Sequence, residues 1–365
     1  MINRRHVMAA GAAATVLPAA AVAEPVTAFD AALTSAFDAV KPVALAGGMV
    51  TPQGLEWSGV RGVRRADGDA SALEDDRWHL GSNTKAMTAA VYARLVEQGR
   101  ARWAMPVVEA FPGMSIDAGW DGATLDDFMT HTAGLKDEAV MGMAWLMTAR
   151  ADAKSLPEQR RALVEKALAA PPLGTRGAFE YGNANYVLVG AAIEAITGAS
   201  WEEVMQAELF TPLGLSSAGF GAPKGDNAWG HRRMGETALA MDPSDTGSDN
   251  PLALGPAGTV HMTMADYACF VRVFLTEGDG WLKPETVRRL VTPVEGQSYA
   301  HGWIVLPPQS WAKGPVIAHE GSNTLWHAIV VADPAGGRAI IGLSNDGGRG
   351  GPACQALARG LILAG

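Results

Sequence analysis

The order of predicted elements along the chain indicates an α+β fold, with an antiparallel β-sheet built from both chain ends. Two strand-like runs lie near the start, at residues 43–50 and 55–64, and four more lie near the end. The middle, from about residue 100 to 290, consists of helical pieces broken by Gly and Pro. Because a sheet needs a second layer to bury one of its faces, we expect helices to flank it and a mostly helical lobe to be inserted between its two halves.

The first predicted elements are a helix and a hairpin. Residues 27–40 have the apolar spacing of a short amphipathic helix. The turn residues Thr51-Pro52-Gln53-Gly54 separate the two strand-like runs that follow. A longer helix begins at Ser82, carries apolar residues on one face, and ends near Gly99, where helices often place a left-handed glycine.

The middle and the end of the chain differ in their hydrophobic period. Helices are predicted at residues 125–130, 157–170, 186–197, 201–210 and 264–275. Strands are predicted at residues 302–306, 315–319, 326–332 and 338–343, followed by a terminal helix at 352–363. We therefore expect one module over residues 24–365. Its α/β lobe would span about 24–110 and 285–365, and its helical lobe about 111–284.

The first 23 residues have the features of an export signal. Arg4-Arg5 precede an Ala-rich apolar run, and Ala21-Val22-Ala23 supplies a small-residue cleavage site. We expect cleavage after Ala23 and, from the paired arginines, the twin-arginine route to the periplasm or the exterior. The run is too short to remain as a membrane anchor. Replacing both arginines with lysine should leave precursor in the cytoplasm, and normal export would argue against this route.

The composition excludes several classes of function. The chain of 365 residues is 48% hydrophobic and 18% charged, with a formal net charge of −9. Such an acidic protein has no electrostatic reason to bind nucleic acid or an anionic membrane. With neither Cys-x-x-Cys nor His-Glu-x-x-His present, the sequence has no metal-site spacing. The two cysteines, Cys269 and Cys354, could pair in an oxidising compartment, and the sequence leaves both this and the oligomeric state open.

The tetrad Gly-Ser-Asn-Thr occurs twice, at residues 81–84 and 321–324, and only the first copy is followed by lysine. On a helix, Ser82 and Lys85 share a face, so the amine can reach the hydroxyl. A serine at a helix N-terminus also has backbone N–H groups directed at any oxyanion formed beside it. To act as a base the lysine must be neutral or share its proton, which requires surroundings that lower its pKa.

A second Ser-x-x-Lys, Ser310–Lys313, shows that spacing alone decides nothing. This pair follows Pro307-Pro308 and runs into Gly314-Pro315, so no helix can align its side chains. We therefore interpret it as a coincidence in a loop.

Two further short motifs could complete a site with the first tetrad. Tyr181-Gly182-Asn183 places a phenol and an amide two residues apart at the entry to a helix, although such a stretch is more often a polar turn with a cap. His319-Glu320-Gly321 follows a strand-like run and could lie edge-on to a substrate, although an ordinary edge strand without a function could have the same sequence pattern. Each motif is weak alone, and the three together are specific.

Their order and separation resemble the penicillin-recognising serine hydrolases, in the branch of class C β-lactamases, DD-peptidases and family VIII-type esterases. The resemblance spans nearly the whole mature chain. The segments that carry it are GSNTKAMTAAVYARLVEQGR, LDDFMTHTAGL, ELFTPLGLSSAGF, GPAGTVHMTMADYACF and YAHGWIV. It implies a β-lactamase/transpeptidase-like fold with the active site between the two lobes.

The resemblance also implies a role for each motif residue in a two-step acyl transfer without metal or cofactor. Ser82 would be the acylated nucleophile and Lys85 its proton acceptor. Tyr181 would act as general base or leaving-group acid, and Asn183 would orient Lys85 and the substrate. His319 would stand at the sheet edge and face the site.

The implied oxyanion hole consists of the backbone N–H groups of Ser82 and of Ser322, the residue just after Gly321. Because Ser322 contributes only its backbone, it needs no lysine of its own. The two Gly-Ser-Asn-Thr copies are therefore expected to meet in space.

The main mechanistic rival is a Ser-His-Asp hydrolase, but the chain has no Gly-x-Ser-x-Gly elbow. In the resembling family the segment around His131 is structural, so we expect that histidine to hold the helical lobe in place. His327, beside Trp326, is kept as a candidate for substrate binding.

Three departures from the family pattern bear on the substrate. His319 replaces the lysine common in β-lactamases. Glu320 would repel a substrate carboxylate if it faced the cleft, or would point away, since strand residues alternate faces. The Met/Trp-rich run at 141–147 could border an acyl group or simply pack in the core.

These departures favour an esterase-like hydrolase of small esters or amides. A β-lactamase or D-alanyl peptidase is the alternative, and a penicillin-binding-like sensor that acylates without turnover is the third.

Overall fold

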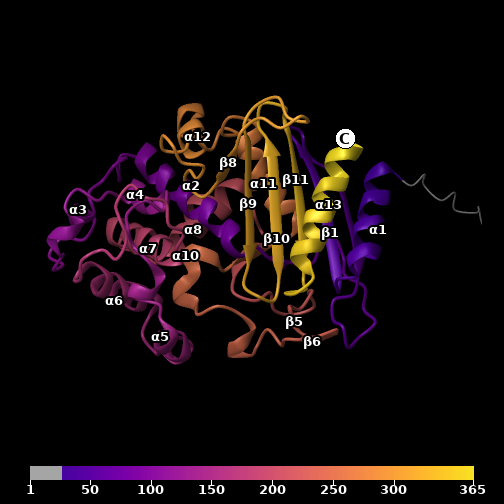
Figure 1. The fold of residues 1–365 in the computed structure, drawn as a ribbon, viewed down its shortest axis with the longest axis horizontal. Helices are drawn as coiled ribbons and strands as arrows, with labels where there is room; N and C mark the ends of the chain where they lie inside the picture. Colours follow the sequence, from indigo (N-terminus) through magenta and orange to yellow (C-terminus); the bar gives the residue numbers. More distant parts are fainter. Residues whose placement is uncertain (1–26) are drawn as a thin grey trace, which may run out of the picture.

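A six-stranded antiparallel sheet is the main structural element of the computed structural model, which describes residues 27–365 (Figure 1). The predicted export signal at 1–23 lies outside these described residues. The strands, in spatial order, are β2 (Gly54–Gly62), β1 (Ala44–Thr51), β11 (Arg338–Ser344), β10 (His327–Asp333), β9 (Val316–Ser322) and β8 (Ile304–Leu306). Strands from both chain ends thus join in one sheet, as the sequence predicts.

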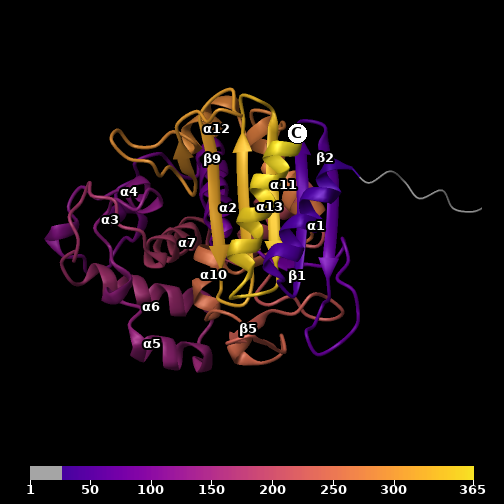
Figure 2. The ribbon, with the colours of Figure 1, turned by 45° about the vertical axis from the view of Figure 1, so that its right-hand side comes forward.

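Side chains of the sheet alternate between two cores. On β1, Leu45 and Met49 pack under α1 (Ala28–Val40) and α13 (Gly350–Ala364), while Ala46 and Val50 belong to the larger core on the opposite face. Figures 1 and 2 show α1 and α13 side by side on one face of the sheet, with α11 (Met264–Leu275) on the other. This period of two follows from the pleat of a strand and explains why both faces are apolar.

Helix α2 (Thr84–Glu97) lies at the centre of the molecule, between the sheet and the helical lobe. Every residue from Thr84 to Ala93 is buried, because α7, α8, α10 and α12 pack around it. A helix buried on all sides needs small or apolar residues all round, and the Ala-rich sequence of α2 supplies them. The sequence predicts burial of one apolar face of this helix, whereas the structure buries the helix on all sides over Thr84–Ala93.

The helical lobe lies to one side of the sheet, at the left of Figure 1. Its helices are α3 (Val107–Ala110), α4 (Leu125–Met129), α5 (Met143–Thr148), α6 (Leu156–Leu168), α7 (Asn183–Thr197), α8 (Trp201–Met205), α9 (Thr211–Leu213) and α10 (Gly255–Gly258); α12 (Pro284–Leu290) follows α11. Several begin with a capping box, for example at Ser155 and Ser200, where the hydroxyl and the glutamate three residues on satisfy the first free N–H groups.

Three features of the middle segment differ from the predicted helices. Strands β4 (Gly219–Phe220) and β7 (Val260–Met262), which form a small sheet with β3 (Trp78–His79), interrupt it, as does a hairpin of β5 (His231–Met234) and β6 (Thr237–Ala240). These strands are too short to show a clear alternation in the sequence. The helix predicted at 201–210 continues through a π-helical stretch to Leu213. Helix α11, expected in the helical lobe, packs on strands β1, β2 and β11 instead.

Two further features concern the possible pairing of the two cysteines and the lengths of the helices. Cys269 is exposed, Cys354 is buried, and both thiols are free. Within residues 27–365, no helix combines the length and the apolar character needed to cross a bilayer.

Candidate active site

Ser82 lies in the 3-10 turn η1 (Gly81–Asn83), between strand β3 and helix α2. Gly81 adopts a left-handed φ of 51°, which turns the chain from the strand into the helix. Ser82 is therefore half-buried at the N-terminus of α2, where the free backbone N–H groups of the first turn gather.

Lys85 is fully buried one turn further along and makes three hydrogen bonds through Nζ. It lies 2.9 Å from Ser82 Oγ, 2.8 Å from Asn183 Oδ1 and 2.8 Å from the carbonyl oxygen of Ala257. The three partners come from three elements, η1, α7 and α10, and so fix the direction in which the amine points. Burial disfavours a charge, and these oxygens compensate for the water that is lost.

Asn183 and Tyr181 flank the start of α7, opposite Lys85. Asp137 accepts hydrogen bonds from Ala184 N at 2.7 Å and from Asn183 Nδ2 at 3.3 Å, so it caps the helix and orients the amide. The Tyr181 ring lies 4.9 Å from Lys85 Nζ and is 44% exposed. Its hydroxyl has no hydrogen-bond partner among residues 27–365 and is free to meet a substrate.

His319 is buried on β9 in a single tautomer. Its Nδ1 lies 2.7 Å from the Glu320 carbonyl and must donate to it, so Nε2 accepts from the Tyr299 hydroxyl at 2.9 Å. Burial, followed by the charge of Lys85, lowers the pKa of His319 to about 3. The imidazole is therefore neutral at physiological pH. Because β8 pairs with β9 only over Val316–Ala318, this part of β9 forms a local sheet edge.

The two Gly-Ser-Asn-Thr copies meet through their glycines. A methyl group at Gly321 would lie 2.1 Å from the Leu80 oxygen and 2.6 Å from Ser82 N, and one at Gly81 would lie 2.3 Å from Ser322 N. Only glycine permits backbones to approach this closely. The backbone nitrogen of Ser82 consequently lies beside Gly321, and that of Ser322 beside Gly81.

Glu320 and His327 lie away from this group. Strand alternation puts Glu320 on the opposite face of β9 from His319, where it contacts His327 Nε2 at 3.3 Å and Gln355 of α13 at 3.0 Å. These contacts hold the pKa of Glu320 below its ordinary value. Of the two orientations considered for Glu320, the structure has the one directed away from Lys85.

His131 supports the backbone beside Tyr181. Its Nδ1 accepts from Gly182 N at 3.4 Å, and its ring lies 4.5 Å from the Tyr181 ring. Burial, with a contribution from the charge of Lys85, lowers the pKa of His131 well below its ordinary value. It therefore forms part of the packing between the lobes.

The remaining candidates lie outside the group around Ser82. Ser310 and Lys313 occupy the loop between β8 and β9, as expected, with Lys313 N bonded to Asp333. In the Met/Trp run, Met141 is buried in the core, whereas Met143 and Met147 of α5 are 72% and 78% exposed. Core packing thus holds for Met141 and, in part, for Trp145, which is partly buried against the core, whereas the two methionines of α5 face solvent.

Three partners of the site escaped the sequence analysis. Tyr299 lies in the quoted YAHGWIV segment, but nothing in the sequence pairs it with His319. Asp137 precedes Asn183 by 46 residues, and the Ala257 carbonyl is a backbone group that no side-chain pattern reveals. Within the described part of the chain, no group of three or more His, Cys, Asp or Glu side chains is placed to hold a metal ion.

The comparisons with known proteins agree with this fold. Residues 29–364 match the sequence model of the Beta-lactamase family. Penicillin-binding protein 4 of Amycolatopsis lactamdurans is 26% identical over 306 residues, which cover 78% of this chain and 76% of that one. The next two curated relatives are longer proteins, of which the chain spans 40% and 54%.

Two solved hydrolase structures share the fold over most of both chains. A D-stereospecific amidohydrolase from Streptomyces sp. has a TM-score of 0.70 at 24% identity, covering 89% of this chain and 97% of that one. EstCE1, described as a hydrolase with promiscuous acyltransferase activity, has a TM-score of 0.74 at 17% identity, with 92% and 97% covered. The β-lactamase/transpeptidase-like fold is thereby confirmed, and the match over residues 29–364 shows that the chain belongs to the Beta-lactamase family, among the penicillin-recognising serine hydrolases.

Proposed function

We propose that this protein hydrolyses small uncharged esters or amides through an acyl-enzyme formed on Ser82. The observation that carries the proposal is the set of three hydrogen bonds around Lys85 Nζ. Asn183 Oδ1 and the Ala257 carbonyl are pure acceptors and each takes one N–H of the amine. When the charged amine gives up the proton that it directs at Ser82 Oγ, its two other N–H groups stay on these acceptors, and the lone pair left behind can accept the hydroxyl proton as the oxygen attacks.

The first step forms a bond between Ser82 Oγ and the substrate carbonyl carbon, while the serine proton passes to Lys85. The backbone N–H groups of Ser82 and Ser322 would stabilise the oxyanion that develops. Tyr181, with its free hydroxyl, would relay a proton to the leaving group as the ester or amide bond breaks. Water then attacks the acyl carbon and gives one proton to the base. The bond to Oγ breaks, the carboxylic acid departs, and the proton taken from water restores the serine hydroxyl.

The neutral state of His319 supports a preference for uncharged substrates. A lysine at this position would offer a positive charge to a substrate carboxylate, whereas this imidazole has both nitrogens committed and a pKa of about 3. EstCE1, which shares the fold, is described as a hydrolase with acyltransferase activity, in keeping with ester chemistry on this scaffold.

A second candidate is an amidase or peptidase for D-amino acid substrates. It is favoured by the similarity to the D-stereospecific amidohydrolase, while the similarity to Penicillin-binding protein 4 favours recognition of penicillin. Turnover of a D-alanyl peptide faster than of a nitrophenyl ester would favour this candidate. An adduct with penicillin that persists for hours, without turnover of either substrate, would favour a sensor.

The proposal is tested with two serine variants on a short-chain nitrophenyl ester. Ser82→Ala should abolish hydrolysis, with a loss of at least about 10³-fold in kcat, because the nucleophile is removed. Ser310→Ala, which changes the other Ser-x-x-Lys, should retain wild-type activity. Equal loss in both variants, or loss in neither, would contradict the assignment.

A further inference from the structure

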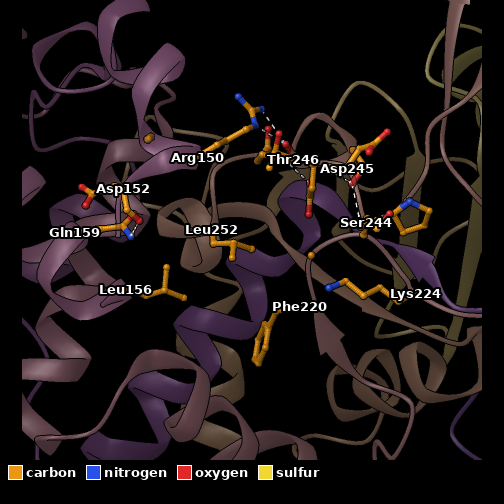
Figure 3. A pocket seen from close by; sticks show the side chains of 17 residues that line it. Arg150, Asp152, Leu156, Gln159, Phe220, Lys224, Ser244, Asp245, Thr246 and Leu252 are labelled. Carbon is orange, nitrogen blue, oxygen red and sulfur yellow. Dashed lines mark hydrogen bonds between the residues drawn. The ribbon is translucent and has the colours of Figure 1, made fainter. Parts of the chain in front are cut away.

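Asp249 is a buried carboxylate outside the three motifs, in the loop that leads from β6 to α10. It lines a cavity of about 300 Å³ between this loop, residues 149–152 that follow α5, and the start of α6 (Figure 3). Arg150, labelled at the edge of that cavity, donates to the Asp249 carbonyl oxygen from Nε at 3.1 Å and from Nη2 at 2.8 Å. The backbone of Asp249 is therefore anchored to the helical lobe.

One carboxylate oxygen of Asp249 reaches the segment before Ser82. His79 Nδ1 accepts from Gly81 N at 3.1 Å, so this nitrogen carries no proton and Nε2 must carry one. Nε2 lies 3.0 Å from Asp249 Oδ2 and donates to it. Asp249 thus fixes the His79 tautomer, and His79 in turn holds the peptide that precedes Ser82.

The other oxygen of Asp249 reaches the segment after Ser322. Asn323 Nδ2 donates to Asp249 Oδ1 at 2.7 Å, which leaves Asn323 Oδ1 to accept from Leu325 N and Trp326 N, both at 3.1 Å. These bonds shape the turn that follows β9. The Trp326 ring also stacks on His79, with centroids 5.6 Å apart.

We propose that Asp249 is a positioning residue that holds the two backbone segments of the oxyanion hole in register through His79 and Asn323. It touches neither Ser82 nor Lys85. The inference rests on the proposed acyl transfer at Ser82. In this account, the Asp249 carboxylate sets the position of the Ser82 N–H group relative to the Ser322 N–H group. A displacement of a fraction of an ångström in either donor weakens the stabilisation of the oxyanion.

Replacing Asp249 with Asn leaves one of the two donors without an acceptor. The amide has a single oxygen, so either His79 Nε2–H or Asn323 Nδ2–H faces its NH₂ group. A change of tautomer or an amide flip by the partner would restore that contact only by breaking the bond to Gly81 N or to Leu325 N and Trp326 N. We expect kcat for a nitrophenyl ester to fall about 10- to 100-fold, with a change in KM below about threefold.

The matching rescue is the exchange Asp249→Asn with Asn323→Asp. The new amide at 249 accepts from His79 Nε2–H and donates to the new carboxylate at 323, whose other oxygen accepts from Leu325 N and Trp326 N. We expect this double variant to recover most of the lost kcat. Only the Asn250 N–H, now 2.7 Å from Asp249 Oδ1, would lose its partner, and it is partly exposed to water.

Asp245→Asn is the control, because it makes the same charge change at an exposed side chain of the same loop. All rates are divided by the number of sites titrated with a fluorophosphonate, so that misfolded protein does not count. The proposal is overturned if Asp249→Asn keeps kcat within twofold of wild type, if KM carries the loss, or if the exchange recovers nothing. Failure of the wild-type protein to react with the fluorophosphonate would instead contradict the proposed function.

Discussion

The charge state of the His319 imidazole is set by the residues around it rather than by the ordinary pKa of histidine. Tyr299 and the Glu320 carbonyl occupy both ring nitrogens of His319, and burial keeps the ring neutral. At the site proposed to receive the substrate, the chain thus has a hydrogen-bonded neutral ring where a lysine would carry a charge. If the proposed function holds, this difference predicts a preference for uncharged substrates.

A matched pair of substrates tests this consequence. A chromogenic cephalosporin carries a carboxylate on its fused ring, and its methyl ester does not. We expect kcat/KM for the methyl ester to exceed that for the free acid by at least about tenfold, because no cation at position 319 offsets the cost of desolvating the carboxylate. Equal or faster turnover of the free acid would contradict the role given to His319.

Short sequence motifs predict those site residues that would act through their side chains. Ser82, Lys85, Tyr181, Asn183 and His319 were selected from short motifs, and the fold brings them to one place. The Ala257 carbonyl could not be selected, because every residue has a carbonyl and only the tertiary structure directs this one at Lys85. Tyr299 and Asp249 are linked to the site by hydrogen bonds between segments that lie far apart in the chain. A single sequence contains no pattern that predicts such pairs.

At the scale of elements, the site depends on the contact between η1 and β9. The two segments approach so closely that backbone atoms of one would meet the Cβ of any other residue at Gly81 or Gly321. This contact places a helix N-terminus against a strand edge. It therefore sets the spacing of the two proposed oxyanion donors.

Gly321→Ala tests this contact directly. The added methyl would lie 2.1 Å from the Leu80 oxygen, so the two segments must separate. We expect the free energy of unfolding to fall by roughly 1–3 kcal/mol and kcat to fall at least about 100-fold. Gly247→Ala is the control, since nothing lies within 4 Å of its Cβ position. Wild-type activity in Gly321→Ala, measured with urea unfolding of both variants, would contradict this account.

Most of the long elements were predictable, whereas the short strands β3, β4 and β7 were not. The strands of the main sheet and helices α1, α6, α7, α11 and α13 follow clear apolar periods, and their ends differ by a few residues. Strands β3, β4 and β7 have only two or three residues each, which is below one full repeat of alternation. They matter to the site nonetheless, because β3 delivers the chain to Gly81.

At the scale of the whole molecule, buried neutral histidines make the fold sensitive to acid. Burial lowers the pKa of His261 and His301 to about 4 and that of His319 to about 3. The ordinary pKa of 6.5 applies in the unfolded chain, so that chain takes up protons first as the pH falls. The stabilisation is fully present above pH 6.5 and is lost progressively down to about pH 4 for His261 and His301 and to about pH 3 for His319.

We therefore expect the midpoint of thermal unfolding to be flat between pH 7 and 8 and to fall steeply between pH 6.5 and 4. Each of the three histidines contributes up to about 1.4 kcal/mol per pH unit to this decline. His301→Gln removes one of them, at a side chain that packs on Trp103 and faces Asp126, and should give a shallower fall. A midpoint that is independent of pH down to 4.5, or an unchanged slope in the variant, would contradict the burial argument.

The most direct test of acyl transfer at Ser82 is the intact mass of the protein after brief reaction with a fluorophosphonate, compared across three forms. Wild type and Ser310→Ala should each gain one adduct, and peptide mapping should place it on Ser82, while Ser82→Ala should gain none. An adduct on any other serine, or undiminished labelling of Ser82→Ala, would contradict the central claim.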